Sequence, residues 1–285
     1  MMLKAPHNLK KLVLENLICY ILVVLIAFAL KYHYSKAGSD ALIWILAPTA
    51  KLVEWTGGIP FEYEAQTGFV NVAQHIVIAP SCAGVNFLII AFCMAAFCGL
   101  HLFRRQGHKL LWLMASGTNA YILTLAVNTL RIIFSTYIYQ VDIYGAWITP
   151  ERVHRLAGIV IYFFFLCLFY MIMNKSLHRL HLKDNLKQTG AAGSGLARSA
   201  HFRGTPITMT PLLWYALITL GVPLLNAAYI GNGARFAEHI GSVAGGCIMV
   251  MTAVFLIRWG WQQAKKYINT QINGSDETQN SDRRR

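Results

Sequence analysis

Three reactive or charged side chains lie beside apolar runs of the sequence, and together they have the composition of a cysteine-based acyl-transfer site. Cys82 lies in IAPSCAGVNFLI, Arg131 in VNTLRIIF and His154 in ERVHRLAG. Ionisable residues next to membrane-spanning runs are costly in hydrocarbon and usually mark a function. A thiolate is a strong nucleophile, an imidazole accepts and returns a proton, and a guanidinium stays charged and stabilises anions.

The chemistry of each side chain suggests its role. We expect Cys82 to be the nucleophile, because Pro80 and Ser81 before it are typical of a helix start, with Ser81 as the N-cap, and the positive end of a helix favours a thiolate. His154 would take the thiol proton and later protonate the leaving amine. Arg131 would stabilise the oxyanion of a tetrahedral intermediate, or hold a carbonyl or carboxylate of the substrate.

Taken singly, each of these residues also has a simpler interpretation. A cysteine at a helix end is more often inert, and an arginine near a membrane interface often extends toward the head groups. A histidine between two arginines, here Arg152 and Arg155, is often solvated. The functional interpretation therefore depends on whether the fold brings the three residues together.

The composition indicates an all-α transmembrane protein. Hydrophobic residues make up 56% of the 285 residues and charged residues 13%, against about 25% charged residues in soluble domains. Runs of about 20 apolar residues span the hydrocarbon core as helices, because backbone groups must be hydrogen-bonded within lipid. Six spans are predicted, at about 12–30, 82–101, 110–131, 156–174, 209–229 and 242–258.

Basic residues between the spans orient the predicted bundle. The N-terminal tail, the loops 101–109 and 175–206 and the C-terminal tail hold 18 of the 25 Lys and Arg residues. Such an excess is typical of cytoplasmic segments, so both termini are predicted to lie in the cytoplasm. The net charge of +13 has the same explanation and does not indicate nucleic-acid binding.

Changes in composition divide the chain into four parts. They are a membrane-embedded core at 1–187, a cytoplasmic linker rich in Gly, Ala and Ser at 188–206, a two-span extension at 207–262 and a disordered basic tail at 263–285.

Two segments of the core are less regular. The apolar segment 41–53 is short and contains Pro48, and we expect it to lie at the membrane interface or to be re-entrant. If it crossed the membrane instead, the N-terminus would lie outside, but the later loops would keep their orientation. The loop 57–81 partly alternates apolar and polar residues around Gly68, which predicts a small hairpin on the outer side.

The alternating direction of the spans is expected to bring Cys82, Arg131 and His154 to one extracytoplasmic face. Cys82 begins the second span, Arg131 ends the third and His154 precedes the fourth. Asn128 lies one helical turn before Arg131, where it can orient the guanidinium. The other cysteines lie in apolar runs, where cysteine behaves as a small hydrophobic residue. The aromatic run at 162–170 is interpreted as a lipid-facing or packing surface, and no spacing typical of a metal site occurs.

The residues around these positions resemble the exosortase and archaeosortase family. Cys-Ala-Gly follows a proline, AVNTLRI contains Asn128 and Arg131, and His-Arg-x-x-Gly begins at His154. The resemblance covers about residues 70–175. Many members have Cys-Ser-Gly where this chain has Cys-Ala-Gly84, which leaves the subtype open.

The resemblance implies a cysteine protease or transpeptidase of a bacterial or archaeal inner membrane. Such enzymes cut the C-terminal sorting signal of an exported protein, which consists of a short motif such as Pro-Glu-Pro, a transmembrane helix and a basic tail. They are understood to pass the protein to a surface acceptor, here unknown. The resemblance implies that Cys82 forms the acyl-thioester, that His154 is the acid and base, and that Arg131 is the stabiliser. Asn128, Ser81 and Gly84 are expected to support them, and no cofactor or metal is expected.

Two other functions fit parts of the sequence. A non-enzymatic component of transport or envelope assembly would have charged or helix-breaking residues near the midplane of several spans, whereas these spans are nearly free of charge there. A serine-based intramembrane hydrolase would need partners for Ser81, Ser116 or Ser135 that the sequence does not suggest. The last two spans have no counterpart in the resemblance, so they are expected to be a subtype extension or a docking surface for the substrate helix.

Overall fold

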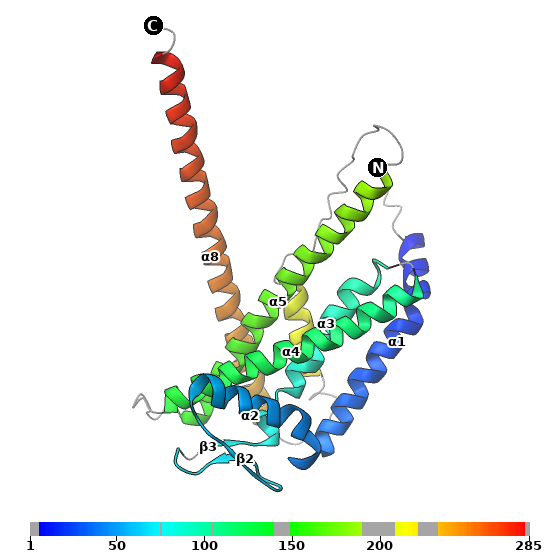
Figure 1. Cartoon of the computed structure of the whole chain (residues 1–285), viewed down its shortest axis with the longest axis vertical. Coiled ribbons are helices and arrows are strands. Elements are labelled where there is room, and N and C mark those ends of the chain that lie inside the picture. The colour runs from blue at the N-terminus through cyan, green and yellow to red at the C-terminus, as the bar shows by residue number, and fades with distance from the viewer. Residues whose placement is uncertain are drawn as a thin grey trace.

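The chain forms a bundle of long helices with a small sheet at one end (Figure 1). The computed structural model describes residues 6–74, 76–103, 105–139, 149–189, 209–221 and 233–282. The long helices are α1 (Pro6–Lys36), α3 (Val85–Leu100), α4 (Gln106–Tyr139), α5 (Pro150–Thr189) and α8 (Gly233–Asp282). The shorter elements are η1 (Asp40–Leu42), α2 (Ile43–Gly57), the strands β1 (Glu62–Glu64), β2 (Gly68–Asn71) and β3 (Ile76–Ile78), the turn η2 (Pro80–Cys82), α6 (Met209–Ala216) and the π-helical η3 (Leu217–Gly221).

Five helices among the described residues are long and apolar enough to cross a membrane. The predicted multi-pass helical bundle is thereby confirmed. The predicted span 209–229 corresponds to α6 and η3, a shorter apolar helix over Met209–Gly221, and the rest of that span lies outside the described residues. The linker predicted at 188–206 also lies outside them, except for the last residues of α5.

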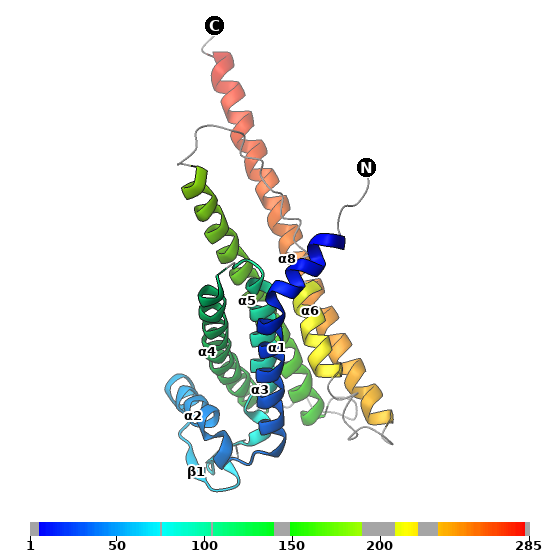
Figure 2. The same cartoon turned by 90° about the vertical axis from the view of Figure 1, so that its right-hand side faces the viewer.

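Helix α3 is the centre of the bundle. Its sequence, VNFLIIAFCMAAFCGL, is apolar on every side, which is typical of a helix surrounded by other helices. In the most apolar stretch of α3, 83% of the residues are buried, whereas in the corresponding stretch of α1 only 6% are buried. It packs against α1, α4, α5 and α6 (Figure 2). Four other helices therefore hold α3 in place.

The segment 41–53, expected at the membrane interface, lies within η1 and α2. Helix α2 has 15 residues and is not one of the five helices of spanning length. Its buried side, which includes Ile45, Thr49 and Val53, follows a helical spacing, and α2 packs against α4 and β2. The helix ends at Gly58, which adopts a left-handed conformation and donates its N–H to the carbonyl of Glu54.

The loop 57–81 contains a three-stranded antiparallel sheet in the order β1-β2-β3, one strand more than the predicted hairpin. Gly68 has a φ of +120°, and a Cβ at this position would collide with the carbonyl oxygen of Ile78 on β3. Glycine therefore permits the close approach of β2 and β3. Strand β3 leads almost directly into η2, so the sheet fixes how the chain enters Cys82.

Helices α5 and α8 both continue beyond the apolar part of the bundle (Figure 1). Helix α8 includes residues 263–282, the described part of the segment predicted as a basic tail. Good helix formers such as Gln, Ala and Lys follow Trp261 and favour continuation of the helix.

Helix α8 packs along α5, and the two approach closely at Gly246, where a Cβ would lie 2.6 Å from Cγ2 of Ile159.

Candidate active site

Cys82 is the last residue of the turn η2, and two residues separate it from the first residue of α3, Val85. Its N–H donates to the carbonyl of Ala79 at 2.8 Å, and its side chain is partly exposed. Helix α3 begins at Val85, and Gly84 is its N-cap. The prediction that Ser81 caps this helix is therefore wrong. The reason is that Ser81 and Cys82 belong to a separate 3₁₀ turn, which Pro80 begins.

Gly84 joins this turn to α3 at a position that strongly favours glycine. It has a φ of +74°, a conformation that other residues adopt at a cost. A Cβ here would lie 3.2 Å from Thr124 Cγ2, 3.3 Å from Asn128 Cγ and 3.3 Å from the Tyr162 hydroxyl. Gly84 thus brings the backbone beside Cys82 against both α4 and α5.

Asn128 on α4 holds this backbone. It is fully buried, and its Nδ2 donates to the carbonyl oxygen of Cys82 at 2.6 Å. Its Oδ1 accepts a hydrogen bond from the Tyr162 hydroxyl on α5 at 2.7 Å. Asn128 was expected to orient Arg131. In the structure the link is indirect, because Asn128 contacts Tyr162 and Tyr162 contacts Arg131.

Arg131 lies between Tyr162 and His154. Its Nη1 donates to the Tyr162 hydroxyl at 3.2 Å, and its Nη2 lies 2.9 Å from Nε2 of His154. The guanidinium carbon lies 5.3 Å from the centre of the Tyr162 ring, a cation–π distance. Nε of Arg131 is buried without a hydrogen-bond partner among the described residues. A Cβ at Gly158 would lie 2.9 Å from this Nε, so the glycine leaves room for the arginine.

Both ring nitrogens of His154 lie within hydrogen-bond distance of a partner. Its Nδ1 lies 3.0 Å from the Ser135 hydroxyl, and its Nε2 faces Arg131. Arginine can only donate, so a hydrogen bond between these two atoms requires Nε2 to accept, which corresponds to a neutral imidazole with its proton on Nδ1. In this arrangement Arg131 occupies the lone pair of Nε2.

Tyr162 is a site residue that the sequence analysis missed. It lies in the aromatic run that was interpreted as a lipid-facing or packing surface, but its hydroxyl links Asn128 to Arg131. Its ring stacks on Phe87 of α3, with centroids 4.7 Å apart. Its spacing was the available signal, because His154, Gly158 and Tyr162 recur every four residues and so lie on one face of α5.

A continuous set of hydrogen bonds thus runs from Cys82 through Asn128, Tyr162 and Arg131 to His154. Cys82 takes part through its backbone carbonyl, while its sulfur lies 4.0 Å from the Ser81 hydroxyl. The ring nitrogens of His154, expected to receive the thiol proton, face Arg131 and Ser135.

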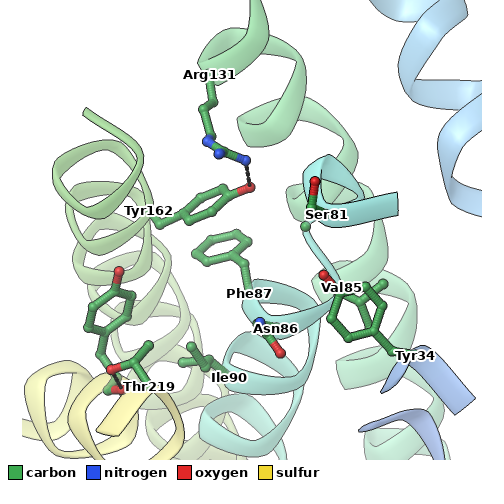
Figure 3. A pocket seen from close by; sticks show the side chains of 11 residues that line it. Tyr34, Ser81, Val85, Asn86, Phe87, Ile90, Arg131, Tyr162 and Thr219 are labelled. Carbon is green, nitrogen blue, oxygen red and sulfur yellow. Dashed lines mark hydrogen bonds between the residues drawn. The ribbon is translucent and has the colours of Figure 1, made fainter. Parts of the chain in front are cut away.

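A cavity of about 180 Å³ adjoins this set of residues (Figure 3). Arg131 and Tyr162 lie at one end of it, and Phe87 and Ile90 of α3 form an apolar part. The cavity is lined by residues of α1, η2, α3, α4, α5 and the segment 209–221, among them Tyr34, Ser81, Tyr215 and Thr219.

Comparison with known families decides the classification. The family model of the transmembrane exosortases matches residues 9–171, more than half of the chain. The chain belongs to the transmembrane exosortase family. The match begins within α1 and ends within α5, so it covers more of the exosortase core than the resemblance around 70–175. No curated protein and no solved structure matches the chain.

The described part of this exosortase holds no group of three or more His, Cys, Asp and Glu side chains that could bind a metal ion. The chemistry that its residues offer is that of a thiol, a neutral imidazole and a guanidinium.

Proposed function

We propose that this exosortase cleaves the C-terminal sorting signals of exported proteins and transfers the proteins to a surface acceptor, with Cys82 as the nucleophile. The observation that carries the proposal is the hydrogen-bonded set from the Cys82 carbonyl through Asn128 and Tyr162 to Arg131 and His154. It joins the entry of α3 to α4 and α5 at one place. Membership of the exosortase family supports the same type of reaction.

The proposed reaction has two halves. The Cys82 sulfur attacks the scissile carbonyl carbon, and the thiol proton passes to His154. As the C–N bond breaks, His154 returns this proton to the leaving amine, and an acyl-thioester remains on Cys82. An acceptor amine or water then attacks the thioester and gives a proton to His154, which returns it to the departing Cys82 thiolate.

Arg131 changes partners during this reaction. Without substrate it donates a hydrogen bond to Nε2 of His154. This bond occupies the one ring lone pair that could accept a proton. When a substrate carbonyl enters, the guanidinium turns to donate to the developing oxyanion. Nε2 is then free to receive the thiol proton, so the base becomes available only when substrate is bound.

The membrane position of the site suits such a substrate. A sorting signal has its cleavage point just outside its own transmembrane helix, and its basic tail stays on the cytoplasmic side. With both termini of the chain in the cytoplasm, Cys82 faces the extracytoplasmic side, where the cleavage point lies. The substrate helix then remains in the bilayer beside the bundle.

The test is tail removal from an exported reporter that ends in a Pro-Glu-Pro motif, one apolar helix and a basic tail, and that the unaltered chain processes. Cys82→Ala should abolish tail removal, and Cys82→Ser should strongly reduce it, because a hydroxyl is a far weaker nucleophile than a thiolate. Cys93→Ala, in the middle of α3, controls for the loss of a buried thiol. Normal processing by Cys82→Ala would remove the nucleophile assignment.

A further inference from the structure

The segment that follows the matched exosortase core contributes a wall of the cavity beside Arg131. Tyr215 on α6 and Thr219 on η3 both line this cavity, although the family match ends at residue 171. Figure 3 shows Thr219 next to Ile90 of α3, at the end of the cavity away from Arg131. The segment is therefore part of the site and not a separate appendage.

Tyr215 presents an unused polar group to the cavity. Its side chain is only 3% exposed, and its ring packs on Phe163 of α5, with centroids 5.5 Å apart. No hydrogen bond to its hydroxyl is found within the described part of the chain. A buried tyrosine hydroxyl normally has a partner, so this group is available to a molecule that enters the cavity.

Thr219 is held in place by neighbours on two elements. Its hydroxyl donates to the carbonyl of Tyr215 at 2.6 Å, which leaves only acceptor capacity on this oxygen. Its own carbonyl lies 3.2 Å from Nε2 of His239 on α8. Residues 217–221 form a π-helical turn, a feature that is frequent at functional sites. Helix α8 thus fixes the position of Thr219 relative to the cavity.

We propose that Tyr215 and Thr219 contact the substrate residue next to the scissile bond and determine which residue is accepted there. The inference rests on the proposed function. At about 180 Å³ the cavity is smaller than the roughly 300–1,000 Å³ of small-molecule pockets, so it suits one compact side chain. Phe87 and Ile90 favour an apolar side chain, while the Tyr215 hydroxyl can donate to a carbonyl of the substrate backbone and Thr219 can accept from its amide.

The first experiment removes each hydroxyl without changing shape. The full chain in detergent is assayed with the reporter tail as a synthetic peptide. Tyr215→Phe and Thr219→Val should each raise KM by about three- to tenfold, the effect of one lost hydrogen bond, with little change in kcat. Tyr170→Phe and Thr49→Val are matched controls, because Tyr170 is buried elsewhere on α5 and Thr49 makes the same bond to the carbonyl four residues earlier.

The second experiment tests selectivity directly. Peptides with Ala, Val, Leu or Phe at each motif position are compared in the unaltered chain and in Tyr215→Ala. The enlarged cavity should shift the preference toward the larger side chains at one position, by about tenfold in kcat/KM. An unchanged order of preference, together with an unchanged KM in Tyr215→Phe and Thr219→Val, would overturn the inference.

A crosslinking experiment covers the case in which these variants fold poorly. A photoreactive residue is placed at 219, or at 217 as a control, since Leu217 is 55% exposed on the same segment. In the Cys82→Ala background the reporter tail should crosslink at 219 and much less at 217. Absence of the crosslink at 219 argues against this inference alone, whereas normal cleavage by Cys82→Ala argues against the proposed function.

Discussion

At the scale of single residues, the site depends on two glycines as much as on its reactive groups. Gly84 lets the backbone of Cys82 approach Asn128 and Tyr162, and Gly158 leaves room for Arg131. The sequence indicates Cys82, Arg131 and His154 as candidates, because ionisable side chains are conspicuous in apolar runs. Tyr162 and Gly84 were less evident, since their roles depend on how α4 and α5 rotate about their axes.

Gly84→Ala should damage the site while the bundle remains. A φ of +74° costs a non-glycine residue about 1–2 kcal/mol, and the added methyl group would press on Asn128 and Tyr162. We expect reporter cleavage to fall by more than about tenfold at nearly normal protein abundance. Gly38→Ala is the control, because a Cβ at Gly38 meets nothing within 4 Å. Full activity of Gly84→Ala would show that the Cys82 backbone need not lie against α4.

Arg131→Lys should also be inactive, although it keeps the charge. The guanidinium contacts Tyr162 and His154 with two different nitrogens, whereas an ammonium is a single point of charge. Loss of an oxyanion-stabilising donor typically lowers kcat by about 100- to 1,000-fold. Cleavage rates of Arg131→Lys are compared with those of Arg105→Lys, an exposed arginine. A near-normal kcat in Arg131→Lys would mean that catalysis does not need the two separate N–H donors of the guanidinium.

At the scale of helices, α5 carries His154 and is supported by α8. Glu238 on α8 lies 3.4 Å from Arg152 and 3.2 Å from Arg155, which flank His154. These partly exposed ion pairs contribute at most about 1 kcal/mol. The closer contact is at Gly246, which packs against Ile159. Hydropathy predicted both helices but not their contact. The reason is that a glycine in an apolar run does not indicate which other helix packs against it.

The two adjacent glycines of α8 give a matched test of this support. Gly246→Leu should push α8 away from α5 and cost about 1–3 kcal/mol of packing energy, whereas a Cβ at Gly245 meets nothing within 4 Å. We expect Gly246→Leu to lower both thermal stability and cleavage, and Gly245→Leu to leave both nearly unchanged. Equal behaviour of the two variants would mean that α8 does not position α5.

At the scale of the whole molecule, the bilayer explains why so much of the fold was predictable. Backbone groups in lipid must be hydrogen-bonded internally, so apolar runs of sufficient length become helices. Alternation of these helices then predicted that Cys82, Arg131 and His154 approach one another. The cavity wall formed by Tyr215 and Thr219 was not predictable, because residues 209–221 reach the site only through packing between helices far apart in the chain.

The orientation of the molecule in the membrane can be tested by thiol labelling of intact cells. Cys82 is partly exposed at the start of its span, whereas Cys93, Cys167 and Cys247 are buried. Cys19 and Cys98 are also partly exposed, but they lie within the apolar helices α1 and α3. With Cys82 on the extracytoplasmic side, a membrane-impermeant maleimide should label the unaltered chain and fail to label Cys82→Ala. Labelling that appears only after the cells are permeabilised would place Cys82 in the cytoplasm instead.

The role of Cys82 as the nucleophile can be tested by identifying the covalent intermediate. The chain is mixed with reporter and quenched in acid, and the adduct is analysed by mass spectrometry with and without hydroxylamine, which cleaves thioesters. A hydroxylamine-sensitive acyl group is expected on Cys82 and should be absent in Cys82→Ala. An acyl group on another residue, or cleavage by the unaltered chain without any adduct on Cys82 under conditions that trap thioesters, would contradict this role.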